Sequence, residues 1–377
     1  MNLDFTTEQN TFRESAQRFL ANECPFAKVR ELEESKDGYA AGLWPKMAEL
    51  GWMGMAFPEQ YGGYGGDFMF TVILQEEIGK AAYPSPFFST VIQCGLTILE
   101  GGTEEQKTEL LTKISEGSLI MALAQYEEEA SYLPGGIKMK AKAQGDQYVL
   151  NGTKMFVMEA NVAHKLIVVA QADPGITLFV VDAKAPGIEI TKMHTIGKDN
   201  TCRVVFKDVK VPKKDVLGQP GKGWDALERM ATKAIVAKCA EMVGGCKACI
   251  DITAQYAKER VQYGKPIGSY QAIQHFMANM ALAYENGSAY LYKVASMVDA
   301  GEDATIEASI LKSAMDENYK FVSERACHVH GGIGTTREAD ITLFYRKAKA
   351  FSYLLGDAEY HDDKVAQAIL KGLPDLA

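Results

Sequence analysis

Apolar and polar positions repeat along this chain with different periods, and the changes between them divide it into three parts. Up to about residue 117, apolar residues recur three and four positions apart, the spacing of one face of a helix. Thr6 with Gln9, and Thr103 with Gln106, have the spacing of capping boxes, so two helices should begin there. We expect helices near 7–22, 41–50, 68–81 and 104–115.

After Gly117 the apolar positions gather into short runs of β-branched residues, separated by turn-forming pairs such as Asn151-Gly152 and Pro174-Gly175. These runs predict a small, mostly antiparallel sheet with strands at 166–170, 176–181 and 203–206. From Trp224 the helical spacing returns, with wide apolar stripes that predict a bundle of about four helices. The expected domains are helical over residues 1–117, sheet over 118–223 and helical bundle over 224–377.

Composition and charge narrow the class of protein. Of the 377 residues, 47% are hydrophobic and 24% are charged, so the chain can bury a large core. No apolar run approaches the roughly 20 residues of a membrane-spanning helix, and residues 1–13 lack the pattern of a signal peptide. We therefore expect a cytoplasmic protein with no membrane partner. The net charge of −9 also disfavours nucleic acid as a partner.

Seven cysteines without paired metal-type spacing indicate reduced thiols rather than a disulfide framework. Cys239, Cys246 and Cys249 lie on the apolar face of a predicted helix, where we expect them to fill the core. His328 and His330 could suggest a metal, but no third ligand is evident, so no metal site is expected.

Four glycine-containing motifs stand out. They are Leu50–Gly54 with the glycine-rich loop 58–66, the run Arg260-Val261-Gln262-Tyr263-Gly264-Lys265-Pro266-Ile267 followed by Gln271, the run His328-Val329-His330-Gly331-Gly332-Ile333-Gly334, and Leu355-Gly356-Asp357-Ala358. A guanidinium such as that of Arg260 offers a fork of donors to phosphate oxygens. Glycines such as Gly331 let backbone amides approach a dinucleotide closely. The second and third motifs are therefore compatible with a phosphate-containing cofactor, although isolated Arg and Gln residues are more often solvated surface groups and the glycines would equally suit the end of a helix.

Occurring together and in this order, the four motifs resemble those of the acyl-CoA dehydrogenase family over nearly the whole chain. The resemblance implies a mainly α fold with a central β domain, built from an N-terminal helical domain, a middle antiparallel β-barrel-like domain and a C-terminal four-helix bundle. It also implies FAD as the cofactor, an acyl-CoA as the substrate and an electron-transfer flavoprotein as the electron acceptor. The expected assembly is a homotetramer or a heterotetramer with a related chain.

In that family the arginine and glutamine of the second motif reach the FAD diphosphate of a neighbouring subunit. The resemblance therefore implies FAD contacts in the bundle from Arg260, Tyr263, Gln271, His328, Gly331, Gly332, Gly334, Gly356 and Asp357. In the sheet domain, Tyr126 to Ser131 stand where the family usually has Thr-Glu-Pro-Gly, and Phe156 and Met158 stand where it has Trp and Thr. Further FAD contacts are expected there from Tyr126, Ser131, Phe156 and Met158. The adjacent glutamates at 127–129 are expected to be solvated.

The catalytic base is the main departure from the family, because Leu355 fills the usual glutamate position and cannot abstract a proton. In some members the glutamate lies on the first long helix of the bundle, at a position that here holds Ala234 or Ile235. Glu241 lies almost two turns further along the same helix face, ~10 Å along the axis. Its apolar neighbours suit a carboxylate to proton abstraction. Glu241 is the candidate base, and Asp357 is the alternative.

The leading hypothesis is FAD-dependent α,β-dehydrogenation of an acyl-CoA thioester to the enoyl-CoA. The departures from the usual motifs resemble those of bacterial members that act on bulky, cyclic or aromatic-derived acyl groups. Two alternatives stay open. The same fold with FAD could catalyse a non-redox elimination on an acyl-CoA, or the chain could be the non-catalytic subunit of a heterotetramer.

Overall fold

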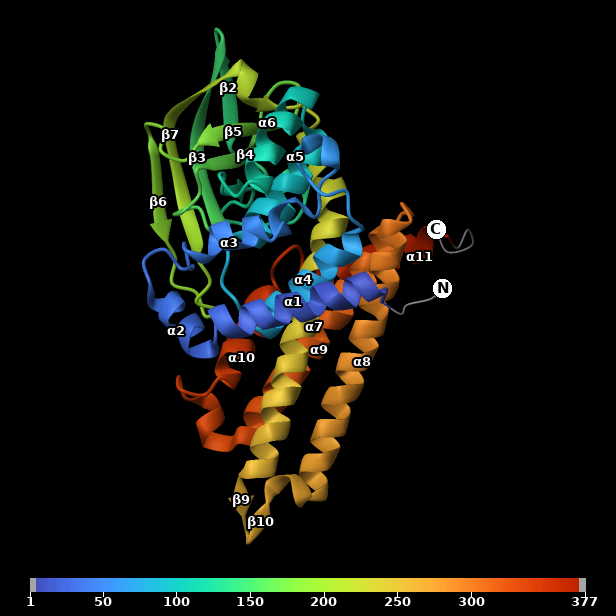
Figure 1. Ribbon diagram of the computed structural model, residues 1–377. Helices are drawn as coiled ribbons and strands as arrows, with labels where there is room; N and C mark the ends of the chain where they lie inside the picture. The colour runs from blue at the N-terminus through green and yellow to red at the C-terminus, as the bar shows by residue number, and fades with distance from the viewer. Residues whose placement is uncertain (1–4, 373–377) are drawn as a thin grey trace. The chain divides into compact units, whose positions relative to one another are not determined.

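The structure, a computed structural model, describes residues 5–372, which fall into two compact units (Figure 1). The helical unit is drawn from Met1–Val29, Phe68–Tyr83 and Ile235–Ala377, and the sheet unit from Arg30–Asp67 and Pro84–Ala234. Both units are discontinuous in sequence. Segments far apart along the chain therefore pack together within each of them.

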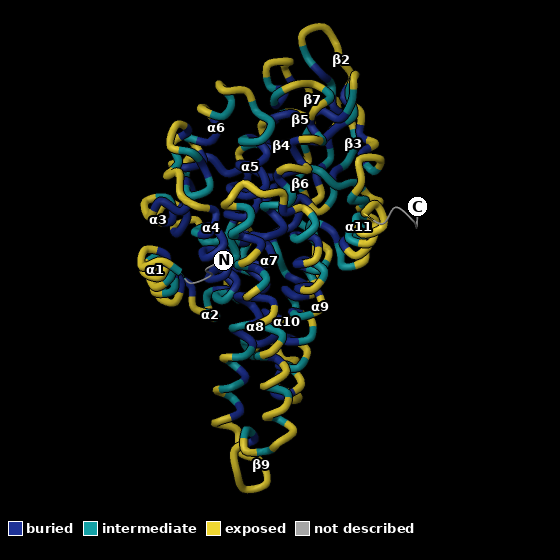
Figure 2. Tube along the Cα trace, turned by 90° about the vertical axis from the view of Figure 1, so that its right-hand side faces the viewer, coloured by how far each residue is buried: buried dark blue, intermediate teal, exposed yellow. Residues whose placement is uncertain are grey.

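The helical unit combines helices from the first hundred residues with those of the last third. They are α1 (Thr7–Glu23), α4 (Phe68–Lys80), the part of α7 (Gly223–Glu259) from Ile235, α8 (Gln271–Asp299), α9 (Thr305–His330), α10 (Ile341–Phe351) and α11 (Ala358–Lys371). The central helix is α9, which contacts α8, α10 and α11. A short hairpin of β9 (Val261–Gln262) and β10 (Lys265–Pro266) joins α7 to α8, and its residues are exposed (Figure 2).

Glycines bring α4 and α7 into backbone contact within the helical unit. A Cβ at Gly79 would overlap the backbone of Glu241, and a Cβ at Gly244 would overlap the carbonyl of Glu76. Only glycine lets two helix backbones approach this closely. The next residue, Gly245, faces Tyr319 of α9 in the same way. This packing fixes the part of α7 that carries Glu241.

The sheet unit surrounds an eight-stranded sheet with short helices. The helices are α3 (Leu43–Glu49), α5 (Leu96–Gly101), α6 (Glu104–Ser115), a π-helix over Phe88–Gly95, and the first part of α7; α2 (Phe26–Glu34) crosses the division between the units. The strands are β1 (Met121–Ala124), β2 (Lys140–Gln144), β3 (Gln147–Met158), β4 (Lys165–Gln171), β5 (Ile176–Asp182), β6 (Ile188–Lys192), β7 (Thr201–Pro212) and β8 (Val216–Leu217).

The strand order is β6-β7-β3-β2-β4-β5-β8, with β1 paired to β4. The β1–β4 and β2–β4 pairs are parallel and the others are antiparallel. Along β7, Cys202, Val204 and Phe206 are buried while Arg203 and Lys207 are exposed, the alternation of a sheet with one face on a core. A shift in the β3–β7 register between Lys154 and Val157 marks a β-bulge.

Much of this fold agrees with the predictions made from the sequence. Both capping boxes form, and the three predicted strands lie within β4, β5 and β7. The helix expected near 41–50 is shorter, and α2, α5 and the π-helix had not been predicted. Cys239, Cys246 and Cys249 are buried, as expected for core residues. The mainly α fold with a central sheet is confirmed. The three domain boundaries stay a prediction, and residues 1–4 and 373–377 of the outer domains lie outside the described residues.

Candidate active site and cofactor site

The segment from Ser352 to Asp357 joins α10 to α11 and has an unusual backbone conformation. Leu355 has φ +65° and Gly356 has φ +105°. A Cβ at Gly356 would lie 2.5 Å from Tyr360 Cδ1 and 2.6 Å from His361 Nε2, so only glycine fits there. Left-handed backbone at a residue with a side chain costs on the order of 1 kcal/mol and persists where the surroundings impose it. Leu355 is therefore held in place by its neighbours.

Two buried side chains hold this segment through its carbonyl oxygens. The Lys312 ammonium of α9 donates to the Gly356 oxygen at 2.9 Å and to the Ser352 oxygen at 3.3 Å. It also contacts both carboxylate oxygens of Asp316 at 2.6 and 2.7 Å. His361 of α11 bonds the Leu355 oxygen through Nε2 at 3.1 Å. Lys312 and His361 are fully buried.

Burial shifts the protonation of both groups beside Lys312. It raises the pKa of Asp316 to about 7, against the opposing effect of the Lys312 charge. Burial, helped by the Lys312 charge, lowers the pKa of His361 to about 4, so its imidazole is neutral at neutral pH. Because the Leu355 oxygen can only accept, His361 carries its proton on Nε2.

Glu241, the candidate base, is buried in α7 and has a partner that the sequence analysis did not consider. Its carboxylate forms an ion pair with the Lys238 ammonium, one turn earlier on the same helix. That ammonium also lies 4.3 Å from the ring centroid of Phe351, the last residue of α10. Glu241 is thus linked through Lys238 to the residue directly before the segment that carries Leu355.

Asp357, the alternative base, caps a helix. Its Oδ1 accepts a hydrogen bond from the backbone N–H of Tyr360 at 3.0 Å, which satisfies one of the free amides at the start of α11. The carboxylate is therefore engaged with the backbone.

The second and third motifs meet at the other end of α9. There Ala257, Ile267 and Val329 form a small core against which Tyr256, Tyr270, Ile273 and Phe276 pack. The His328 ring lies edge-on to Phe276, with centroids 5.5 Å apart. We call this region, residues 256–276 and 328–334, the bundle tip. It unites motifs that are more than fifty residues apart in sequence.

The bundle tip presents donors to solvent. Arg260, Gln271, His328, Gly331 and Gly332 are all exposed, whereas Gly334 is buried. Among the residues that the structure describes, the Arg260 and Gln271 side chains have no hydrogen-bond or ion-pair partner.

The hairpin of the bundle tip turns through Tyr263 and Gly264, both with positive φ, as a two-residue type I′ turn requires. Tyr263 is 94% exposed, and no part of its helical unit covers it.

The remaining predicted cofactor residues belong to the sheet unit. Phe156 lies in the β-bulge of β3 with φ +56° and is exposed, and Met158 is half-buried. Tyr126 is half-buried beside Tyr132, and the Ser131 hydroxyl accepts from the Leu133 amide at 3.2 Å. Bulges often re-aim a side chain beside an active site. Phe156 is presented in this manner.

The expectation of three solvated glutamates is wrong for Glu127. Its carboxylate accepts from Lys154 Nζ at 2.7 Å and from the backbone amides of Lys138 and Met139 at 3.1 and 3.0 Å. Lys154 is fully buried, and burial lowers its pKa to about 8 although Glu127 opposes this. A buried ammonium requires such a partner. Glu128 and Glu129 are exposed, as expected.

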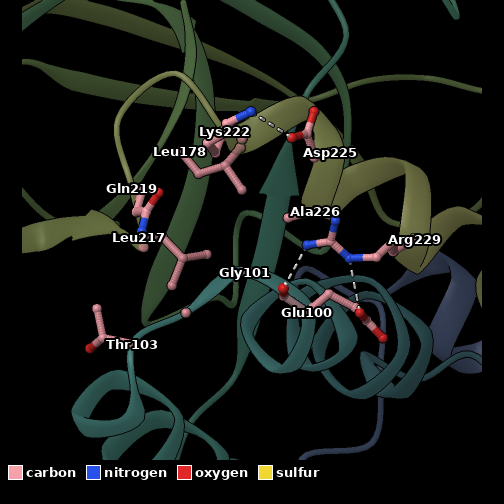
Figure 3. A pocket seen from close by; sticks show the side chains of 13 residues that line it. Glu100, Gly101, Thr103, Leu178, Leu217, Gln219, Lys222, Asp225, Ala226 and Arg229 are labelled. Carbon is pink, nitrogen blue, oxygen red and sulfur yellow. Dashed lines mark hydrogen bonds and ion pairs between the residues drawn. The ribbon is translucent and has the colours of Figure 1, made fainter.

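A pocket of about 340 Å³ lies in the sheet unit, beside the start of α7 (Figure 3). Its charged side chains neutralise one another: Arg229 Nε lies 3.2 Å from Glu100 Oε2, and Lys222 Nζ lies 3.4 Å from Asp225. None of the residues predicted to bind FAD or act as the base lines this pocket.

Residues 5–372 contain neither a cluster of metal ligands nor a membrane-spanning helix. No three His, Cys, Asp or Glu side chains within residues 5–372 are placed to hold a metal ion. His330 instead stacks on Tyr256, with ring centroids 4.3 Å apart, and its Nδ1 lies 2.8 Å from the Ala326 oxygen. Over the same range, no helix is long and apolar enough to cross a membrane.

Comparison with known proteins decides the family. Residues 6–118 match the N-terminal domain, residues 122–209 the middle domain and residues 221–370 the C-terminal domain of acyl-CoA dehydrogenases. The chain belongs to the acyl-CoA dehydrogenase family. It is an oxidoreductase of that family, and the resemblance carried by the four motifs is confirmed.

Individual members of the family align with this chain over almost its whole length and theirs. The probable acyl-CoA dehydrogenase YngJ of Bacillus subtilis is 33% identical, over 98% of this chain and 100% of that protein. The caffeyl-CoA reductase-Etf complex subunit CarC of Acetobacterium woodii is 31% identical, over 97% of this chain and 99% of that protein. The structure of butyryl-CoA dehydrogenase from Megasphaera elsdenii is similar, with a TM-score of 0.90, 29% identity, and coverage of 98% and 100%.

Acyl-CoA dehydrogenases are FAD-binding flavoproteins. The bundle tip has the chemical groups that suit an anionic group such as a diphosphate. Arg260 supplies charged donors without a partner among the described residues. A Cβ built at Gly331 or Gly332 would meet nothing within 4 Å, so there is open space beside this backbone. An anionic group could approach the backbone and the guanidinium there.

Two features of the site were missed from the sequence. Lys312 and Asp316 have the spacing of an ordinary exposed i, i+4 ion pair, but both face the core. Their position inside an otherwise apolar stripe of α9 was the signal available. His361 gave no comparable signal, since a lone histidine in a helix has many uses.

Proposed function

We propose that this chain catalyses the FAD-dependent α,β-dehydrogenation of an acyl-CoA thioester, with electrons passed to an electron-transfer flavoprotein. Membership of the acyl-CoA dehydrogenase family supports the reaction class. The relative named as a subunit of a caffeyl-CoA reductase-Etf complex supports such a flavoprotein as the electron partner. We further propose a cytoplasmic homotetramer or a heterotetramer with a related chain. The exposed apolar residues Val261, Tyr263 and Leu282 support such association.

Glu241 is proposed as the base that removes the proton from the carbon next to the thioester carbonyl. The observation that carries this role is the chain of contacts from Glu241 through Lys238 to Phe351. These contacts connect a buried carboxylate, through Lys238, to the residue directly before the segment in which Leu355 occupies the family's usual glutamate position. Asp357, by contrast, is engaged as a helix cap.

The proposed cofactor contacts divide between the units. In the bundle tip, Arg260, Tyr263, Gln271, His328 and the glycines 331, 332 and 334 would hold the diphosphate, as a charged and flexible backbone surface can. Tyr126, Ser131, Phe156 and Met158 are proposed contacts in the sheet unit, as are Gly356 and Asp357 beside Leu355. FAD, when bound, supplies the acceptor for the hydride of the next carbon.

The substrate class follows from the departures at these positions. Leu355, Phe156 and Met158 are apolar where the family usually has Glu, Trp and Thr. The site would therefore be more apolar and differently shaped than that of a plain fatty acyl enzyme. We propose a bulky, cyclic or aromatic-derived acyl group as the substrate.

A second function is supported by one observation: Leu355 cannot act as a base, and Asp357 is engaged with the backbone. A chain without a working base would be the non-catalytic subunit of a heterotetramer. Its purified form would then bind FAD but would not react until a related chain with a glutamate is supplied.

The test is to purify the chain alone, record its visible spectrum and add straight, branched and cyclic acyl-CoA thioesters without oxygen. The proposal predicts a yellow protein whose flavin absorption is bleached by at least one thioester. A yellow protein that no thioester bleaches favours the non-catalytic subunit or a non-redox elimination, and product analysis of the thioesters separates these two. A colourless, folded protein contradicts FAD binding.

A further inference from the structure

The segment Ser352–Asp357 is anchored more heavily than a short connection between helices needs to be. Three of its carbonyl oxygens, those of Ser352, Leu355 and Gly356, accept from buried side chains of two other helices. Connections of this kind usually lie in solvent, where water satisfies their carbonyls. Here the anchoring groups are an ammonium and an imidazole, which are costly to bury.

Lys312 uses its full donor capacity at this one place. An ammonium has three N–H groups, and those of Lys312 reach the Asp316 carboxylate, the Gly356 oxygen and the Ser352 oxygen. Asp316 is itself buried, so the Lys312 ammonium has its counter-charge inside the protein. The pair therefore fixes the segment from α9 on both sides of Leu355.

The residue between these anchors is the strained one. Leu355 has φ +65°, its own oxygen is held by His361, and the next oxygen is held by Lys312. Backbone strain of this kind persists only where several contacts determine the conformation, and it gathers at functional sites. The anchors and the strain thus point to one purpose, a fixed direction for the side chain at position 355.

We propose that Lys312 is a positioning residue, which acts through the carbonyls of Ser352 and Gly356 to fix Leu355 as a specificity-determining side chain toward the acyl group of the substrate. This inference rests on the proposed function. It assigns a role to the apolar residue at position 355 and to the buried ion pair behind it. Neither is required for the proton abstraction proposed for Glu241.

The first test measures amide hydrogen exchange of residues 353–357. Replacing Lys312 alone would leave Asp316 buried without its partner, so the double variant Lys312→Met/Asp316→Asn is used, which removes both charges. We expect exchange in this segment to accelerate by about tenfold or more. Lys320→Met, the same change at an exposed position of α9, is the control and should leave the exchange unchanged. Unchanged exchange in the double variant would overturn the proposal.

A second comparison separates positioning from general stabilisation. Glycine adopts positive φ without strain, so Leu355→Gly removes the need for the anchors, whereas Leu355→Ala keeps the strain. The acceleration caused by the double variant should be several-fold smaller in the Leu355→Gly background than in the Leu355→Ala background. Equal acceleration in both would show that Lys312 only stabilises the packing and would overturn the positioning role.

The third readout is substrate affinity, followed by the change in the flavin spectrum as an acyl-CoA is added. The double variant should bind the preferred thioester about tenfold more weakly, while Lys320→Met binds it normally. Equal affinity in the double variant and the parent would overturn the specificity role. If the parent chain neither binds nor reacts with any thioester, the proposed function fails, and the exchange experiments still decide whether Lys312 positions the segment.

Discussion

Polar groups lie at both ends of α9, but they are buried at one end and exposed at the other. Near its start, Lys312 and Asp316 are buried, and their polar atoms bond to one another and to the segment around Leu355. At its other end, the bundle tip exposes Arg260, Gln271 and Gly331. The two places are roughly 25 Å apart along the helix.

The two regions also differ in how closely they match the motifs of the acyl-CoA dehydrogenase family. The bundle tip retains the family's motif and leaves its donors available to a ligand, as a cofactor site should. The segment at Leu355 keeps the family's glycine but not its glutamate, and its polar contacts are internal. This contrast is consistent with our proposal that the chain keeps the cofactor site while its catalytic carboxylate lies on α7.

The largest expected effect that tests this contrast is on FAD binding. Arg260→Ala should weaken FAD binding about tenfold to a hundredfold, because a charge-assisted hydrogen bond contributes about 1.5–3 kcal/mol. The FAD affinity of Arg260→Lys should lie between those of the parent and Arg260→Ala, since lysine keeps the charge but not the fork of donors. Fluorescence titration of the apoprotein with FAD measures this.

Lys320→Ala, an exposed position of α9 outside the bundle tip, serves as the control and should bind FAD normally. Unaltered FAD affinity in Arg260→Ala would mean that the bundle tip is not the cofactor site, and the contrast between the ends of α9 would lose its meaning.

At the buried end, the next effect is on stability as a function of pH. The pKa of His361 is lowered to about 4 from its ordinary 6.5, so between these values the unfolded chain binds more protons than the folded one. Stability contributed by this group is therefore lost as the pH falls from about 6.5 toward 4, by about 3 kcal/mol. Urea unfolding at several pH values measures it.

Asp316 has the opposite dependence. Its pKa is raised to about 7, so stability linked to it is lost as the pH rises from about 4 toward 7. For this reason the free energy of unfolding of the parent is compared with that of His361→Gln at each pH. His275→Gln serves as the exposed control. A difference that does not change with pH would show that His361 is not buried as described.

The smallest effect compares two adjacent glycines of the bundle tip. Gly331 has φ +66° and Gly332 does not have positive φ, although a Cβ at either meets nothing within 4 Å. Gly331→Ala should therefore lower the free energy of unfolding by about 1 kcal/mol, and Gly332→Ala should leave it unchanged. Both should weaken FAD binding if the diphosphate lies against this backbone. Normal FAD binding in both variants would contradict that placement.

Much of the fold could be predicted from local patterns in the sequence. Capping boxes at Thr6 and Thr103 and the β-branched runs of β4 and β5 depend on neighbouring residues alone, so they were predictable. The π-helix Phe88–Gly95 was not predictable, because no local pattern marks it; in the structure it packs against β1. The cofactor residues of the bundle tip were expected from the resemblance to the family's motifs, because no local pattern shows that segments more than fifty residues apart meet there.

Charged residues in the interior were the hardest part of the structure to predict. The pairs Lys312–Asp316 and Lys238–Glu241 have ordinary helical spacing, so their apolar neighbours on the helix were the sole indication in the sequence that they face inward. Glu127 was misjudged as solvated because its partner, Lys154, lies in β3, 27 residues further along the chain. Long-range partners of this kind are invisible to periodicity.

The central claim is that an acyl-CoA dehydrogenase lacking the glutamate at position 355 uses Glu241 instead. The most direct test is the rate of flavin bleaching by a reactive thioester, measured by anaerobic stopped flow in the parent, Glu241→Gln and Asp357→Asn. The account predicts a loss of about a hundredfold to ten-thousandfold in Glu241→Gln, the usual contribution of a general base. Asp357→Asn, which keeps the helix cap, should react like the parent. A Glu241→Gln protein that bleaches as fast as the parent would contradict the claim.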